Sequence, residues 1–312
     1  LDIRGDGPTL TYLNLNGYGI TKKGSNMFGL THTTATNDLG TSFIDITAGS
    51  VTLEEYASLS GGTGNTIRVR GGAYFDLYNI RKPIDWSLSL DDGGRLFTRN
   101  GFGTNFNIVT GPVTLGGRAT FESGGAYSDS YSGDISGTGP LVKSGSDAGL
   151  TYLRGTNNAW SGGTLVSNST LCVAVPGSLP GYATDVLVTN SGCLAFRVGG
   201  TDPVAQPGWT AAQIDALVNN GTTFQSTTAS VGFETAYENL DFTFALPQIG
   251  VRKLGPNTLT LSGAGANLGP VRVFGGTLDL SPVSRYLGDQ GVVVGQSVQT
   301  ADPLATLVVG GT

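Results

Sequence analysis

The chain has 312 residues, 50 of them glycine, and its 17 Lys and Arg against 23 Asp and Glu give a formal net charge of −6. This glycine content excludes a helical bundle, because glycine destabilises helix interiors, and the lack of a glycine at every third position excludes collagen. A hydrophobic share of 38% excludes a disordered chain, and the negative charge argues against a nucleic-acid partner.

Short runs with alternating apolar and polar residues begin near the N-terminus, and this alternation is typical of half-buried strands. Examples are TIRVR at 66–70, WSLSL at 86–90 and FNIV at 106–109. Two sets of apolar residues recur at intervals of about 20: Ile67, Leu88 and Ile108, and Leu77, Leu96 and Leu115.

This period predicts an all-β fold, a parallel solenoid whose rungs contain about 20 residues each. Three short strands and their turns need roughly that length, and apolar side chains that point inward then stack in columns. Glycine pairs at strand ends fit sharp corners. The competing architecture is a β-sandwich or an up-and-down barrel, which also has many short strands.

Two cysteines and two tyrosines are candidate contact residues. Cys172 and Cys193 lie about one rung apart, which leaves two alternatives: a disulfide between adjacent rungs, or unbonded thiols. The alternation at 74–78 predicts that Tyr74 and Tyr78 face outward, either as ordinary exposed aromatics or as residues that stack on sugars or pack against a neighbouring chain.

A short helix is predicted near 210–220, where the strand pattern stops. Thr210 and Gln213 have the spacing of a capping box, and Asn220 with Gly221 is a typical helix end. One interpretation is a spacer that covers an apolar patch; the other is a protrusion for partner contact. Three apolar residues would form the face used in either case: Ile214, Leu217 and Val218.

Three segments share a longer pattern in which a lysine precedes a glycine: 19–53, 135–173 and 249–280. The last of them begins with IGVRKLG at 249–255 and continues with TLTLSG at 258–263.

The corresponding lysines are Lys22, Lys143 and Lys253, and their spacing gives a superrepeat of about 120 and then about 110 residues. We interpret each as a turn residue whose stem covers apolar surface while its ammonium stays in water.

The pattern resembles the autotransporter-associated β-strand repeat, whose usual form is G-x-L-x-K-x-G-x-G-x-L-x-L-x-G. The copy at 19–53 departs from it, because no L-x-L-x-G strand follows Gly24. The resemblance implies a right-handed parallel β-helix, which is the passenger of a large bacterial protein exported across the outer membrane to the cell surface.

We divide the chain into rungs at 1–199, an excursion with the short helix at 200–247, and further rungs at 248–312. It reads as an internal piece of a longer polypeptide. The expected partners are other segments of that chain, neighbouring copies, surface glycans or other cells.

Residues for catalysis are scarce. The single histidine, His32, lies in a threonine-rich stretch and is interpreted as a surface residue, and neither zinc-ligand spacing nor a phosphate-binding loop is present. The local acidic pairs are Glu54 with Glu55, Asp91 with Asp92, and Asp129 with Asp134. We therefore predict no catalytic, cofactor-binding or metal-binding residues, and no cofactor.

The sequence thus predicts a structural or adhesive surface protein, a stiff scaffold for cell-surface assembly or adhesion. The alternative is a secreted glycan-active enzyme, a lyase or hydrolase, which would need at least three acidic and basic groups converging in one groove.

Overall fold

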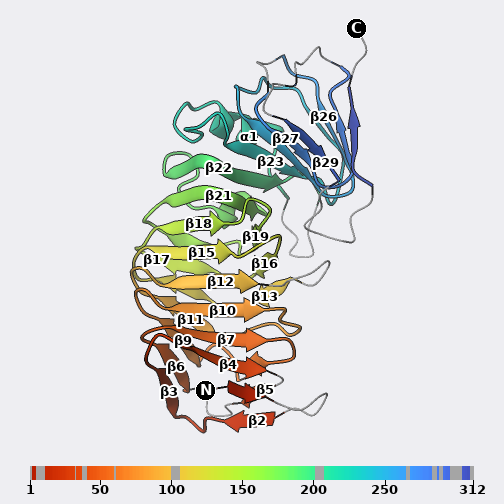
Figure 1. The fold of residues 1–312 in the computed structure, drawn as a ribbon. Coiled ribbons are helices and arrows are strands. Elements are labelled where there is room, and N and C mark those ends of the chain that lie inside the picture. The colour runs from red at the N-terminus through yellow and green to blue at the C-terminus, as the bar shows by residue number, and fades with distance from the viewer. Residues whose placement is uncertain are drawn as a thin grey trace.

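A computed structural model provides the structure of residues 2–4, 11–31, 33–36, 41–59, 61–99, 106–200, 207–264, 268–282, 287, 291–295 and 304–309. The chain is all-β and forms a solenoid of about 11 turns, with about 22 residues per turn and one short helix. The turns wind in a right-handed sense from the N-terminus at the bottom of Figure 1. All four sheets contain parallel pairs, which confirms the predicted solenoid over a sandwich or barrel.

The first face of the solenoid is a seven-stranded sheet. Its strands are β3 (Gly19–Lys22), β6 (Phe43–Ile46), β9 (Thr66–Val69), β11 (Ser87–Leu90), β14 (Val113–Leu115), β17 (Ile135–Gly137) and β20 (Ala159–Trp160). Ile67 pairs with Leu88, as the spacing predicts. Ile108 does not join them, because it lies on another face and is exposed.

The second face runs up the front of Figure 1. Its strands are β1 (Asp2–Arg4), β4 (Met27–Thr31), β7 (Ser50–Glu54), β10 (Tyr74–Tyr78), β12 (Arg95–Arg99), β15 (Ala119–Ser123) and β18 (Leu141–Gly145), and then the first halves of β21 (Thr164–Val173) and β22 (Val186–Arg197). Leu96 pairs here with Phe75, whereas Leu115 is on the first face, so the predicted column of Leu77, Leu96 and Leu115 is wrong.

The third face closes each turn. It begins with a small sheet, β2 (Thr11–Asn14), β5 (Thr33–Thr36) and β8 (Ser58–Leu59), and continues as β13 (Asn107–Val109), β16 (Ser128–Tyr131) and β19 (Leu150–Leu153). The long strands β21 and β22 pass through the corner between the second and third faces. They join these faces into one 16-stranded sheet.

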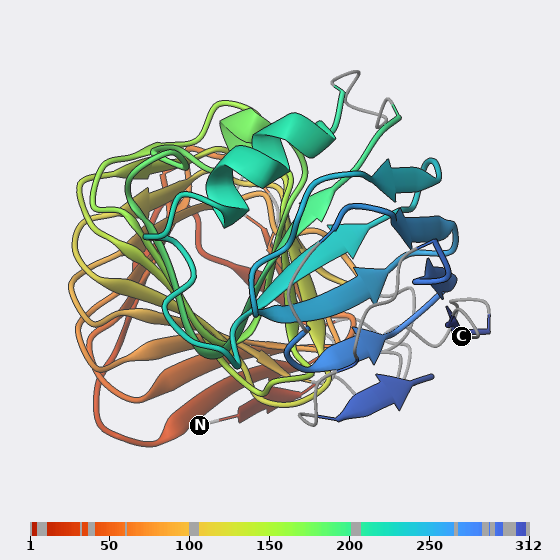
Figure 2. The same ribbon diagram turned by 90° about the horizontal axis from the view of Figure 1, so that it is seen from above.

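The C-terminal turns continue only the third face. Its added strands are β23 (Ser230–Glu234), β25 (Gly250–Leu254), β27 (Val271–Val273) and β29 (Val292–Val294), and a new sheet forms from β24 (Leu240–Phe242), β26 (Thr258–Leu261), β28 (Thr277–Asp279) and β30 (Thr306–Val308). These turns are therefore offset sideways from the first ones (Figure 2). Isolated parallel bridges join Trp209 to Val198 and Phe224 to Val188, and regular strand pairing continues from Ser230.

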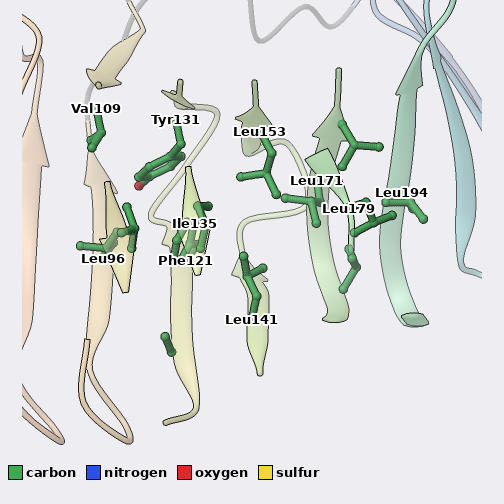
Figure 3. Packing of buried hydrophobic residues seen from close by; sticks show 14 of the residues in the cluster. Leu96, Val109, Phe121, Tyr131, Ile135, Leu141, Leu153, Leu171, Leu179 and Leu194 are labelled. Atoms are coloured by element: carbon green, nitrogen blue, oxygen red, sulfur yellow. The ribbon is translucent and has the colours of Figure 1, made fainter. Parts of the chain in front are cut away.

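Inward-facing side chains stack from turn to turn (Figure 3). One column on the third face runs through five fully buried residues: Val109, Tyr131, Leu153, Val173 and Phe196. Removing such surface from water stabilises the stack by about 25 cal/mol per Å². The core is thus a long ladder in which each turn supports the next.

The predicted helix is α1 (Ala211–Val218), and the capping box at Thr210 and Gln213 is formed. A short 3₁₀ turn at Pro176–Ser178 is the other helical element among the described residues. No described helix has the length and apolarity to cross a membrane.

Seen from above, the helix lies over the end of the stack, above the turn of β22 in which the second face has its last strand (Figure 2). Its apolar residues Ile214, Leu217 and Val218 are buried in the main core. Because they face inward, these three residues cover the core and cannot themselves form an exposed contact surface.

Candidate functional site

The superrepeat lysine Lys253 fills a cage of backbone oxygens at a corner of the solenoid. Its Nζ donates hydrogen bonds to Leu254 O at 2.8 Å, Gly255 O at 2.7 Å and Gly275 O at 3.0 Å. Gly255 has a φ of +76°, which bends the chain around the ammonium at little steric cost. The lysine therefore ties one turn to the next.

Lys22 makes the same set of contacts near the N-terminus. Its Nζ donates to Lys23 O at 3.0 Å, Gly24 O at 2.6 Å and Ala48 O at 3.1 Å. Gly24 has a φ of +77°, matching the glycine of the other corner. The repeated lysine-glycine pattern thus encodes a specific corner structure.

Lys143, the third superrepeat lysine, has a different environment. It is fully buried and donates to Ser123 Oγ at 2.6 Å. Burial lowers the pKa of Lys143 to about 8, although the negative charges of Asp129 and Glu122 oppose this shift. The interpretation of these lysines as water-exposed turn residues is therefore wrong for Lys143 and for Lys253, which is also fully buried.

A buried carboxylate, Asp129, organises polar contacts inside the solenoid. It accepts hydrogen bonds from Thr98 at 2.8 Å, Tyr131 at 2.9 Å and Thr151 at 2.5 Å. All four side chains are at most 1% exposed. The group is a satisfied internal network, and a polymeric substrate has no access to it.

The other acidic pairs also have structural partners. Asp91 pairs with Arg68 and Arg70, and Asp92 accepts from the backbone N–H of Arg118. Asp134 accepts from the backbone N–H of Asn157. Among the residues with described placement, no three His, Cys, Asp or Glu side chains form a metal-binding group. His32 lies outside the described residues.

The predicted outward tyrosines lie on the second face. Phe75 and Leu77 are buried, whereas Tyr74 and Tyr78 are half-buried on the outer side, as the alternation predicts. Arg95 lies over the Tyr74 ring at 5.0 Å and Arg99 over the Tyr78 ring at 5.3 Å.

These guanidinium groups occupy ring faces on which a sugar would stack, and the arginines are themselves held by carboxylates. Arg95 pairs with Glu122 at 3.0 Å, and Arg99 pairs with Asp76. Asp76 is fully buried, and this burial raises the pKa of its carboxyl in spite of Arg99. The cluster is therefore an internally paired surface.

The two cysteines are unbonded and buried. In the pairing of β21 with β22, Cys172 is opposite Ala195, and Cys193 is opposite Thr170. The offset of two residues places the Cα atoms roughly 8 Å apart, beyond the limit of about 7 Å for a disulfide. Burial raises the pKa of Cys172 well above its ordinary value and that of Cys193 to about 11.

A contact that the sequence did not indicate lies on the outer side of the third face. Arg252 on β25 reaches Asp147, in the turn before β19, with Nη2 at 2.5 Å from Oδ1. Strands β21, β22 and β23 lie between these two residues in the sheet. Arg252 also donates to Thr170 Oγ1 at 2.9 Å and Ser191 O at 2.7 Å, and Arg272 pairs with Asp147 as well.

The sheet therefore curls so that its outer side is concave at these strands. The small residues at the bend fit this curvature: a Cβ on Gly232 would lie 2.4 Å from the Cβ of Ala195. A second apolar cluster fills the concave side, consisting of Leu150, Tyr152, Cys172, Cys193, Ala195, Leu254 and Phe274. Neither this cluster nor the ionic clasp of Arg252 with Asp147 follows a local motif, which is why sequence reasoning missed them.

Comparison with known proteins gives one informative similarity. The chain is 28% identical over 261 residues to a protein named "Adhesin BmaC autotransporter" from Brucella suis biovar 1 (strain 1330). The match covers 72% of this chain but 8% of that protein, so the chain spans a small part of its curated relative. No protein-family model and no solved structure match the chain. This similarity and the parallel β-solenoid fit an autotransporter passenger.

Proposed function

We propose that the chain is an adhesive, surface-exposed segment of a long bacterial autotransporter passenger. The observation that carries this proposal is the similarity to an autotransporter adhesin across 72% of the chain, together with the parallel β-solenoid fold. The lysine corners favour membership of the autotransporter-associated repeat family.

The construction of the solenoid supports a scaffold role. Each turn is bonded to the next by sheet hydrogen bonds and by the stacked core, and the cages of Lys22 and Lys253 add bonds at two corners, so the stack resists bending along its length. The buried or internally paired carboxylates described above support a binding role over hydrolysis, because glycan cleavage needs acidic groups that reach the substrate.

Two experiments on surface exposure and adhesion test the proposal. Antibodies against the 312-residue chain should label intact cells of the source bacterium, and external protease should remove the label. Beads coated with the folded chain should adhere to cultured epithelial cells, and beads coated with the heat-unfolded chain should not. Label found only after cell lysis, or equal adhesion by both kinds of bead, would contradict the proposal.

An activity assay separates the adhesive role from the enzymatic alternative. We expect no release of reducing ends from a panel of soluble polysaccharides incubated with the chain. Release that disappears in a variant of one carboxylate would replace the adhesive proposal with a glycan-active enzyme.

A further inference from the structure

A pocket of about 390 Å³ opens where the helical excursion returns to the solenoid. One wall is the segment from Val218 at the end of α1 to Thr227, and the other is 247–249, just before β25. The volume is at the lower end of the range of about 300–1,000 Å³ that small-ligand sites occupy.

Hydrogen bonds hold both walls in place. Asn219 Nδ2 donates to Ala245 O at 2.9 Å, which ties the end of the helix to the segment before β25. The other side of the loop is bonded to β22, because Val188 N donates to Thr223 O at 2.7 Å and Gln225 N donates to Val188 O at 3.0 Å. The pocket is therefore preformed.

The lining of the pocket contains no charged side chain. Apolar surface comes from residues such as Phe224 and Ile249, and amide groups come from Asn219, Gln225 and Gln248. Asn219 Nδ2 donates to Asp215 Oδ1 and Ala245 O, and Gln225 Nε2 donates to Thr222 O, which leaves the two amide carbonyl oxygens as acceptors. Gln248 is exposed and offers both a donor and an acceptor.

We propose that this pocket binds a neutral sugar ring of a surface glycan, an inference that rests on the proposed adhesive function. A sugar presents hydroxyl groups that pair with amides and C–H faces that pack on apolar side chains. A charged ligand is disfavoured, because its charge would lose water without gaining a partner of opposite sign.

The test uses the 312-residue chain and four sugar probes, observed by ligand NMR saturation transfer and titration. Galactose, mannose and N-acetylglucosamine are the neutral probes, and N-acetylneuraminic acid is the anionic one. At least one neutral probe should bind, with a Kd on the order of 1 mM, and the anionic probe should bind at least tenfold more weakly.

Gln248→Ala should weaken binding of the neutral probe about tenfold, the usual effect of losing a hydrogen bond worth about 1.4 kcal/mol. Gln248→Glu keeps the shape of the side chain and adds a charge. It therefore tests, with little change in packing, whether sugar binding depends on the neutrality of the pocket lining. Asn157→Ala, an exposed amide outside the pocket, is the matched control and should bind like the parent chain.

Three results would overturn the proposal: no binding by any neutral probe, equal binding of the anionic probe, or unchanged binding by Gln248→Ala. If bead adhesion persists while no sugar binds, the pocket proposal fails and the adhesive function stands. If sugars bind as expected but beads do not adhere, the adhesive function fails.

Discussion

Lys22 and Lys253, at opposite ends of the stack, donate to equivalent backbone oxygens. Each ammonium bonds the carbonyls of the next two residues and a third carbonyl in the following turn. The two corners differ in burial, because Lys253 is fully buried and Lys22 is half-buried. Substituting each lysine in turn therefore shows how much burial adds to the stabilisation that the cage provides.

Lys253→Met should destabilise the chain by about 3 kcal/mol, because three buried carbonyls lose a charged donor and have no water to replace it. Lys22→Met should cost about 1 kcal/mol or less, since water reaches its carbonyls. Urea unfolding followed by circular dichroism measures both values. Equal losses for the two variants would show that burial does not set the strength of the cage.

The corner also shows what the sequence could and could not predict. The lysine-glycine spacing located the corners at Lys22 and Lys253, because the pattern is local, but Lys143 bonds the side chain of Ser123 and forms no such cage. Burial of Lys253 depends on the carbonyl of Gly275, contributed by the next turn, and no local pattern specifies that contact. The period of about 20 residues between apolar positions similarly predicted the solenoid, and the capping box at Thr210 predicted the helix.

Of the two alternatives for the cysteines, the disulfide does not form, and the reason is more specific. A register shift occurs between Ser167 and Ser169, next to Asn168 with its φ of +59°. Before the shift Thr164 pairs with Val186, and after it Thr170 pairs with Cys193. The inserted residue thus accounts for one of the two positions by which the thiols are offset. A count of residues per rung cannot detect such an insertion.

The pairing across this bulge can be tested by chemical cross-linking. Mild oxidation of the parent chain should leave Cys172 and Cys193 unbonded. In the double variant Ala195→Cys with Cys193→Ser, the new thiol lies directly opposite Cys172, within disulfide range. Non-reducing peptide mapping should find the new bond only in the variant, and a native Cys172–Cys193 bond would refute the register.

Buried Lys143 should make stability depend on pH. Its pKa is about 8 in the folded chain and 10.5 in the reference state. Between these values the unfolded chain holds the proton and the folded chain does not, so the contribution of Lys143 to stability rises with pH. The full change is about 3 kcal/mol.

Cys193 acts in the opposite direction, because its pKa is raised from 9.0 to about 11 and the unfolded chain loses that proton first. The measurement is therefore the difference in unfolding free energy between the parent chain and Lys143→Met at pH 7, 8, 9 and 10. The parent should gain stability relative to the variant over this range. A constant difference would show that Lys143 titrates normally.

Arg252 and Asp147 form the clasp on the concave side of the sheet, and Arg252 is 1% exposed. Asp147→Asn removes the carboxylate that pairs with both Arg252 and Arg272, leaving a buried guanidinium without its counter-charge. A loss of about 3 kcal/mol or more is expected for such a change. Asp45→Asn, which breaks the partly exposed pair with Arg70, is the control and should cost much less.

The clasp also shields Cys193, because Arg252 bonds Thr170 directly opposite that cysteine. Loosening the clasp should open the concave side and speed the reaction of Cys193 with a thiol reagent under native conditions, with little change in the circular dichroism spectrum. Arg272→Ala, which leaves the Arg252 pair intact, should give an intermediate rate. If Asp147→Asn reacts as slowly as the parent chain, the apolar cluster holds the bend by itself, since Leu254 and Phe274 remain buried against the small residues of β21 and β22.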